Sequence, residues 1–387
     1  MSKKRYYGAA FLMATSAIGP GFLTSTASFT AQLGASFGFA ILVSILVDWI
    51  AQVNIWRAVT ASGQTASGLV NAMYPGLGHV LSGLIISGGM IFNIGNIAGC
   101  GLGLQVLTGL DVTTGAVVSA ALCILLFWIK EAGAAMDWFA KILGFVMIGL
   151  TLYVAVVSQP PLSEALWRSG WPERIDPNAI LTIVGGTVGG YITFAGAHRL
   201  LEAGVVGREQ VETASRSATT AIVAASAMRI LLFLAALGVV SRGISLAAAN
   251  PAASVFEAAA GRVGYFIFGV VIWAAAVTSV VGASFTSVSF AGSLHPGLEQ
   301  RKRGLTIGFI AVAAALFVWY GKPVKVLLFA GAFNGVILSL ALALVLWAST
   351  RPALMDGYQP PRWLLWAGAL VSVLLLVPGC MAVWALF

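Results

Sequence analysis

Apolar runs of roughly 20 residues follow one another along the whole chain, and this feature limits its fold more than any other. The chain has 387 residues, of which 59% are hydrophobic and only 9% carry a charge. In a soluble domain about a quarter of the residues are charged, so a chain this apolar needs lipid as the solvent over most of its surface. The pattern predicts an all-α integral membrane protein and excludes the water-soluble classes.

Breaks between the apolar runs divide the chain into eleven expected transmembrane helices. A short interfacial helix over 250–260, capped by Asn250 and Pro251, is expected between two of them. No room is left for a soluble domain, so residues 1–387 are expected to form a single transmembrane domain. The expected helices are 8–35 and 178–200, both interrupted, together with 38–60, 79–107, 112–130, 138–158, 214–240, 264–291, 304–320, 325–349 and 363–386.

The Lys and Arg residues predict the orientation of the chain. With the N-terminus inside, fourteen of the 21 Lys and Arg residues fall on the inner side, six on the outer side, and Arg229 within a helix. Cytoplasmic loops of membrane proteins carry an excess of positive charge. We therefore expect a multi-pass protein of the cytoplasmic (inner) membrane with a cytoplasmic N-terminus. Because the helix number is odd, Phe387 is expected outside.

Two of the expected helices carry Gly or Pro together with hydroxyl residues where the middle of the membrane should be. The first cluster runs from Ile18 to Gln32 and the second from Val184 to Gly196. A helix broken within the membrane frees backbone N–H and C=O groups, which must then line a cavity or the protein interior. The clusters lie about 165 residues, or five helices, apart, and such paired breaks are typical of inverted-repeat secondary transporters. The alternative is a pair of glycine-rich packing helices.

The paired breaks predict a transport domain built from two five-helix repeats. The repeats are expected over about 8–158 and 178–349, followed by an extra helix over about 363–386. A channel is the second class to consider, but it would need a continuous polar pore. Motifs of metalloproteases, serine hydrolases and phosphate-binding loops are absent from the sequence. We therefore expect a transporter that uses alternating access, with no enzymatic activity and no cofactor.

At these residues the chain resembles the NRAMP family of transporters. Gly19-Pro20-Gly21-Phe22-Leu23 matches the family's start of helix 1, and Gly186-Thr187-Val188 matches its approach to the helix 6 break. The resemblance implies a leucine-transporter-type fold, an inverted 5+5 repeat with an eleventh helix, in which helices 1 and 6 are broken at the midplane. It is strongest to an outlying bacterial NRAMP-like branch, whose members are encoded beside subunits of 5-oxoprolinase.

The metal-binding residues of the family are missing from the positions that match them. The family's Asp-Pro-Gly-Asn at the helix 1 break corresponds here to Thr30-Ala31-Gln32-Leu33, and its Met-Pro-His at the helix 6 break to Gly189-Gly190-Tyr191. The Asp and Glu of its helix 3 correspond to Asn93 and Asn96, and His198 lies near the position of its second helix 6 His. A divalent cation needs anionic or soft ligands. We therefore expect no metal site of the usual kind and no efficient transport of Mn²⁺ or Fe²⁺.

The expected substrate site is uncharged and rich in hydrogen-bonding groups. The N-termini of half-helices favour an anion such as a carboxylate, so the expected substrate is a small organic acid. The gene neighbourhood that the resemblance implies makes 5-oxoproline the first candidate, and the alternative is a divalent cation, Mg²⁺ or Mn²⁺, at a modified site. The expected substrate-binding residues are Thr24, Ser28, Thr30, Gln32, Thr187, Gly189, Gly190, Tyr191, Thr193 and Asn334.

A second set of polar residues is expected to form a coupling or polar network: Asp48, Gln52, Asn93, Asn96, His198 and Arg229. An intramembrane carboxylate such as Asp48 is functional by default, and the alternative is an ion pair with Arg57 or Lys141. Arg229 is expected to pair with Asp48 or Glu131, or to attract an anion. The expected partners are the small-molecule substrate, the lipid bilayer and a coupling ion. We expect a monomer that binds no nucleic acid.

Overall fold

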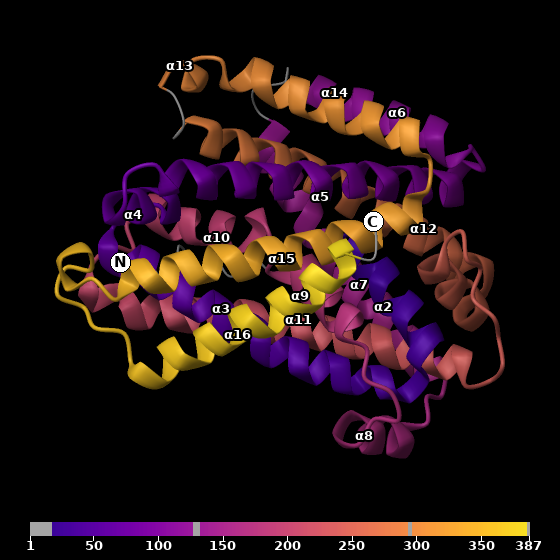
Figure 1. The fold of residues 1–387 in the computed structure, drawn as a ribbon. Helices are drawn as coiled ribbons and strands as arrows, with labels where there is room; N and C mark the ends of the chain where they lie inside the picture. The colour runs from indigo at the N-terminus through magenta and orange to yellow at the C-terminus, as the bar shows by residue number, and fades with distance from the viewer. Residues whose placement is uncertain (1–17, 127–131, 293–295, 385–387) are drawn as a thin grey trace.

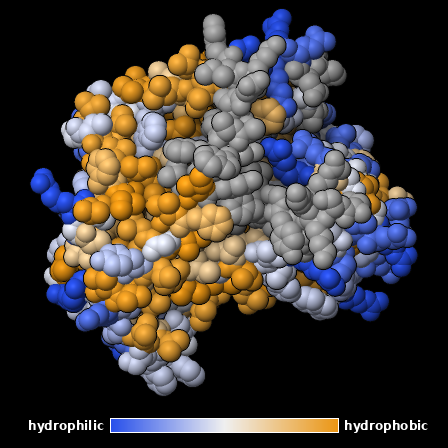
Figure 2. All heavy atoms as spheres, turned by 180° about the vertical axis from the view of Figure 1, so that it is seen from behind, coloured by the Kyte–Doolittle hydropathy of each residue, from blue (hydrophilic) through white to orange (hydrophobic). Residues whose placement is uncertain are grey.

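A computed structural model describes residues 18–126, 132–292 and 296–384, and every regular element in these ranges is a helix. Eight of the described helical segments are long and apolar enough to cross a membrane, or nine if the bent pair over 144–157 and 162–170 forms one span. Figure 1 shows the long helices packed side by side in one bundle. On the face in Figure 2, hydrophobic residues cover a broad area and hydrophilic residues gather towards the edges. The expectation of an all-α membrane protein is confirmed.

Each of the eleven expected ranges coincides with a helix or a pair of helices, although residues 8–17 of the first, 127–130 of the fourth and 385–386 of the last lie outside the described ranges. The helices are α2 (Pro20–Leu33), α3 (Phe37–Ser62), α5 (Leu77–Thr108), α6 (Val112–Leu126), α7 (Ala132–Val157), α9 (Pro177–Thr187) with α10 (Tyr191–Glu202), α11 (Val211–Val240), α12 (Pro251–Gly292), α14 (Lys302–Tyr320), α15 (Pro323–Ser349) and α16 (Arg362–Trp384).

Short helices that the sequence analysis did not predict lie between the long ones. They are too short to show the apolar periodicity of a span, which explains why they were missed. One of them, α8, turns away from the end of α7 by 106° and lies at the edge of the bundle (Figure 1). The short helices are α4 (Ala66–Met73), α8 (Leu162–Gly170) and α13 (Pro296–Glu299), with 3₁₀ turns η1 (Gly34–Ser36), η2 (Arg208–Gln210) and η3 (Pro352–Leu354).

The short helix expected over 250–260 is present as the first part of α12. The helix begins at Pro251, and the Asn250 side-chain oxygen accepts a hydrogen bond from the backbone N–H of Ala253 at 3.2 Å. Gly261 then interrupts the helix with φ 60° and ψ −160°, a conformation that glycine adopts at low cost. The predicted cap and the separation from the long helix are both confirmed.

Glycines allow α9 to pack directly against the backbone of α15. A methyl group at Gly185 would collide with the carbonyl oxygen of Gly331, and one at Gly331 would collide with the backbone of Thr182. A methyl group at the next residue, Gly186, would meet no atom within 4 Å. One side of α9 therefore lies in direct backbone contact with α15, while the adjacent side faces open space.

The neighbouring glycines of α9 offer a test of this packing. We expect Gly185→Ala to lower the free energy of unfolding by about 1–3 kcal/mol, the usual cost of overpacking, because the opposing backbone cannot move aside. We expect Gly186→Ala to change it by less than about 0.5 kcal/mol. Thermal unfolding of the two purified variants in detergent measures the difference. Equal losses of stability would contradict the direct contact between α9 and α15.

Candidate transport site

The expected break in helix 6 lies between α9, which ends at Thr187, and α10, which begins at Tyr191. Gly190 has a φ of +52°, and its backbone N–H donates to the Asn334 carbonyl oxygen at 3.3 Å. A side chain at Gly190 would collide with the Asn334 side chain. Residues 187–192 are all buried, so the interrupted backbone lies inside the protein as the membrane requires. The break predicted in helix 6 is confirmed.

The first expected helix is described only from Ile18 onwards, because residues 8–17 lie outside the described ranges. Gly19 is extended, with φ −95° and ψ 179°, and α2 begins at Pro20 and continues to Leu33. Proline suits the first position of a helix because its missing N–H would have no partner there. The Thr30 hydroxyl donates to the Thr26 carbonyl oxygen at 2.7 Å, a bond within the continuous helix. No break therefore lies within Pro20–Leu33, and residues 30–33, which the resemblance matches to the family's Asp-Pro-Gly-Asn motif, are helical.

The positions that the resemblance matches to the family's helix 1 ligands hold Thr30 and Leu33, and α2 contains no Asp or Glu. The start of the site helix thus offers hydroxyls and backbone groups but no carboxylate.

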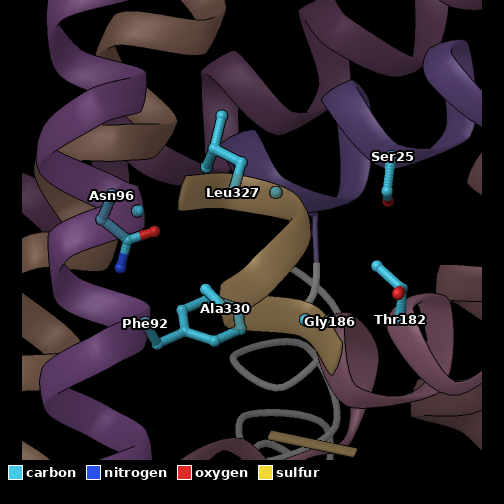
Figure 3. Close-up of a pocket in the computed structure, with 10 residues that line it drawn as sticks. Ser25, Phe92, Asn96, Thr182, Gly186, Leu327 and Ala330 are labelled. Atoms are coloured by element: carbon cyan, nitrogen blue, oxygen red, sulfur yellow. The ribbon is translucent and has the colours of Figure 1, made fainter. Parts of the chain in front are cut away.

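A small cavity lies where α2, α5, α9 and α15 meet. Figure 3 shows Phe92 and Asn96 of α5 on one side of it, with Ser25 of α2 and Thr182 of α9 on the other. Its volume is about 10 Å³, close to the minimum of roughly 10–15 Å³ that one water molecule needs. The cavity is therefore too small for an organic solute, which fits only after these helices move apart. The other lining residues are Gly21, Gly95, Gly186, Leu327, Ala330 and Gly331.

A buried polar cluster lies beside the helix 6 break, between α5, α12 and α15. The Asn93 amide donates to the Ser284 hydroxyl oxygen at 3.0 Å, and the Asn334 amide donates to two backbone carbonyls. The side-chain oxygens of Asn93 and Asn334, both polar atoms of Asn96 and the Ser287 hydroxyl have no hydrogen-bond partner. A buried polar atom left unpaired costs about 1–3 kcal/mol, so these atoms are free to bind a solute or water.

The expected substrate-binding residues divide into two groups. Thr187, Gly189, Gly190, Tyr191 and Asn334 form or contact the helix 6 break. The Tyr191 ring meets the Phe92 ring edge-on at 5.6 Å, which brings the start of α10 next to the cavity lining.

The remaining expected residues lie on α2 and further along α10. The hydroxyls of Thr24, Ser28 and Thr193 are buried without a hydrogen-bond partner, and Thr24 and Ser28 lie at helical spacing from the cavity-lining Gly21. The Thr30 hydroxyl is engaged within its own helix, and Gln32 is exposed at the far end of α2. The structure does not bring these last two residues to the cavity.

Arg229 of α11 occupies the centre of the polar network. Its Nη1 lies 3.5 Å from Asp48 Oδ2 and donates to the Ser44 hydroxyl oxygen at 3.0 Å. Its Nη2 donates to the Ile183 carbonyl oxygen at 3.2 Å and to the Thr187 hydroxyl oxygen. Both members of the ion pair are only 2% exposed. The expected pairing of Arg229 with Asp48 is confirmed.

The alternative ion pairs are not formed by the residues that the structure describes. Arg57, in the last two turns of α3, lies nine residues after Asp48 and pairs instead with Glu212 of α11 at 3.9 Å. Glu131 lies outside the described residues, as does the side chain of Lys141.

The other network residues are dispersed. Asn93 and Asn96 belong to the polar cluster, and the Gln52 amide donates to the Ala218 carbonyl oxygen at 3.3 Å. The His198 side chain is 37% exposed and lies 3.7 Å from Glu202, one turn further along α10. The structure does not bring His198 to the cavity.

Sequence reasoning missed several residues of the site. Ser25 and Gly186 lie inside the two Gly and hydroxyl clusters, so that signal was available. Ser44 could have been found because it precedes Asp48 by four residues and therefore shares its helix face. Thr182 and Leu327 line the cavity only because α9 crosses α15, and no local pattern reveals this crossing.

The buried ion pair predicts a strong coupling between its two residues. We expect Asp48→Asn and Arg229→Met each to cost about 3–5 kcal/mol, because each leaves one buried charge without its partner. The double variant should recover most of this loss. A double-mutant cycle on the free energy of unfolding measures the coupling. If the two losses simply add, the pair does not interact as the geometry indicates.

Among the residues in the described ranges, no group of three or more His, Cys, Asp or Glu side chains is placed to hold a metal ion. The cavity lining and the polar cluster contain amides, hydroxyls, aromatic rings and glycines, and no group that ionises near neutral pH. The chemistry of the site is therefore neutral hydrogen bonding.

Known proteins resemble the chain over nearly its whole length. A family model described as natural resistance-associated macrophage protein-like (Nramp) matches residues 10–385. The uncharacterized membrane protein YcsG of Bacillus subtilis is 54% identical over 372 residues, 96% of this chain and 92% of that protein. An uncharacterized membrane protein of Haemophilus influenzae is 53% identical over 370 residues, 96% of this chain and 93% of that protein.

Solved structures resemble the fold at low sequence identity. The manganese transporter of Eremococcus coleocola, in complex with an aromatic bis-isothiourea substituted compound, has a TM-score of 0.76 and 18% identity over 97% of this chain and 85% of that chain. Inward-facing Mhp1 has a TM-score of 0.64 with 16% identity over 99% and 91% of the two chains. MhsT in complex with L-phenylalanine has a TM-score of 0.61 with 15% identity over 98% of each chain. These likenesses show the leucine-transporter-type fold.

Proposed function

We propose a substrate for this chain on the premise that it belongs to the Nramp family, as the match over residues 10–385 shows. Members of this family are transporters, so the chain is a membrane transporter with a leucine-transporter-type fold and not an enzyme. The proposed substrate is a small polar organic acid, with 5-oxoproline as the first candidate, moved by alternating access.

The neutral polar cluster beside the helix 6 break carries the proposal. A desolvated divalent cation needs anionic or soft ligands, yet the positions that the resemblance matches to the family's ligands hold Thr30 and Leu33 in helix 1 and Gly189-Gly190 in helix 6. Asn93 and Asn96 replace the acids of helix 3. Neutral amides and hydroxyls suit a solute that both donates and accepts hydrogen bonds.

The unpartnered atoms match the groups of a lactam acid. The side-chain oxygens of Asn93 and Asn334 can accept a ring N–H, and the Asn96 amide can donate to a ring carbonyl. The first turns of α2 and α10, which begin at Pro20 and Tyr191, leave backbone N–H groups that suit a carboxylate. 5-Oxoproline carries one of each of these groups.

The second candidate is a divalent metal cation, Mg²⁺ or Mn²⁺, at a modified site. Its support is the likeness of the fold to the manganese transporter of Eremococcus coleocola. Hydroxyl and amide oxygens are hard ligands that hold a hydrated cation weakly, which favours Mg²⁺ over the softer Mn²⁺.

The small cavity fits a carrier whose site opens to one side at a time. We propose that α2 and the half-helices α9 and α10 move relative to α5 and α15 to admit the solute. The proposed setting is the cytoplasmic membrane, with the N-terminus inside, the C-terminus outside and the protein a monomer. A coupling ion that drives the transport is a further part of this proposal.

Uptake by proteoliposomes decides between the two substrates. We expect saturable uptake of labelled 5-oxoproline and a rise in the melting temperature of the purified protein with this acid, because ligand binding stabilises the folded state. Mn²⁺ and Mg²⁺ should produce neither. The proposal fails if a divalent cation gives both uptake and a thermal shift while 5-oxoproline and similar small acids give none.

Restoring an acid of helix 3 should oppose the transport of an anion. We expect Asn96→Asp to lower the apparent affinity for the organic acid by about tenfold or more, since a like charge opposes the carboxylate by upwards of ~1.4 kcal/mol. The matched control is Asn71→Asp on α4, whose side-chain oxygen accepts from the backbone N–H of Gly76 and can do so as a carboxylate. The control should transport normally. An unchanged affinity in the Asn96→Asp variant would mean that the carboxylate of the substrate binds away from position 96.

A further inference from the structure

The oxygen atoms around Arg229 all act as acceptors. The Ser44 hydroxyl gives its own proton to the Ile41 carbonyl at 2.8 Å, and the Thr187 hydroxyl gives its proton to the Ile183 carbonyl at 2.6 Å. Each hydroxyl oxygen therefore turns a lone pair towards the guanidinium. The other two acceptors are a carboxylate and a backbone carbonyl. Carboxylate, carbonyl and hydroxyl oxygens together form the kind of ligand set that holds a hard metal cation.

These oxygens of Asp48, Ser44, Ile183 and Thr187 form an oxygen cage that lies beside the start of α2 and the helix 6 break. Thr187 is the last residue of α9, and Ile183 lies one turn before it. The ring of Phe22, in the first turn of α2, lies 4.8 Å from the centre of the Arg229 guanidinium. The C-terminus of a helix carries a partial negative charge that a cation stabilises. The guanidinium thus occupies the point where the end of α9, the start of α2 and the middle of α3 come together.

Burying the Arg229–Asp48 ion pair costs desolvation free energy, and a gain in stability does not account for its presence. Arg229 Nε and Asp48 Oδ1 have no hydrogen-bond partner, although both residues are buried. A well-packed apolar pair of similar volume is often as stable as a buried ion pair or more so. The charge of Arg229 therefore serves a purpose at this position beyond holding the bundle together.

We propose that Arg229 is a built-in substitute for an exchangeable cation beside the helix 6 break. Its tethered guanidinium keeps α2, α3 and α9 in position, so the transporter needs no alkali or divalent cation bound at this point. Arg229 does not line the cavity and acts as a positioning residue. The inference rests on the proposed function only in taking the helices at this break as the moving parts of a carrier.

Removal of the guanidinium should leave a site that a free cation can fill. We expect the melting temperature of the full chain to be the same in sodium, potassium and choline chloride of equal ionic strength. Arg229→Ala should melt several degrees lower in choline chloride. It should regain several degrees, in a saturable manner, with sodium or with millimolar guanidinium, because a ligand of the folded state raises its stability.

Two control variants separate the cage from general effects of salt. Arg242→Ala removes an arginine from the end of the same helix, where Nε donates to the Gly238 carbonyl oxygen at 3.1 Å, and should show no cation-specific shift. The double variant Asp48→Asn/Arg229→Met lacks the carboxylate of the cage and should not respond to cations. The proposal is overturned if Arg229→Ala responds no more than these controls, or if sodium already stabilises the unaltered protein through Asp48.

If Arg229→Ala does not fold, two variants that keep a long side chain at this position test the same point. Arg229→Lys keeps the charge and should melt within a few degrees of the unaltered protein in every salt. Arg229→Gln keeps similar length without the charge and should depend on the cation in the buffer. A Lys variant that is as unstable and as salt-dependent as the Gln variant would overturn the proposal. None of these measurements uses a substrate, so their outcome is independent of whether the chain transports an organic acid.

Discussion

A lipid environment cannot satisfy backbone N–H and C=O groups, and this constraint governs the centre of the molecule. Wherever a helix is interrupted, neighbouring helices must supply the missing hydrogen bonds. At the helix 6 break α15 does so through the Asn334 carbonyl, which accepts from Gly190, while α11 sends Arg229 to the carbonyl of Ile183 near the end of α9. These hydrogen bonds hold the helices around the break together. Buried polar atoms without a hydrogen-bond partner lie beside the same break, and they suit the binding of a polar solute.

The sequence was informative wherever one local pattern had one physical meaning. Apolar runs of spanning length located the eleven helices, and the cluster of glycines and hydroxyls from Val184 to Gly196 located the helix 6 break, where Gly190 has a positive φ. The ion pair of Arg229 with Asp48 could also be anticipated, since a charge within a membrane needs a partner.

The sequence misled where one pattern had two meanings. Hydroxyl residues line a broken helix, but they also bond to carbonyls of their own continuous helix. Thr26 and Thr30 of α2 do the latter, so residues 30–33, which the resemblance matches to the family's break motif, lie in a continuous helix. The cavity lining from α15 was beyond reach for another reason. Leu327 and Gly331 are next to Thr182 and Gly186 only through the crossing of two helices that are distant in sequence.

The glycine contact between α9 and α15 has a consequence for movement. Helices that meet through large side chains interlock, and sliding one past the other requires the side chains to change rotamers at an entropic and steric cost. Gly185, Gly331 and Gly335 present bare backbone at this crossing, so fewer side chains have to be disengaged, and those of Leu181 and Thr182 face glycines rather than other side chains. Small shear displacements along this surface therefore meet a low barrier. The feature that brings the two helices closest together is also the one that lets them slide.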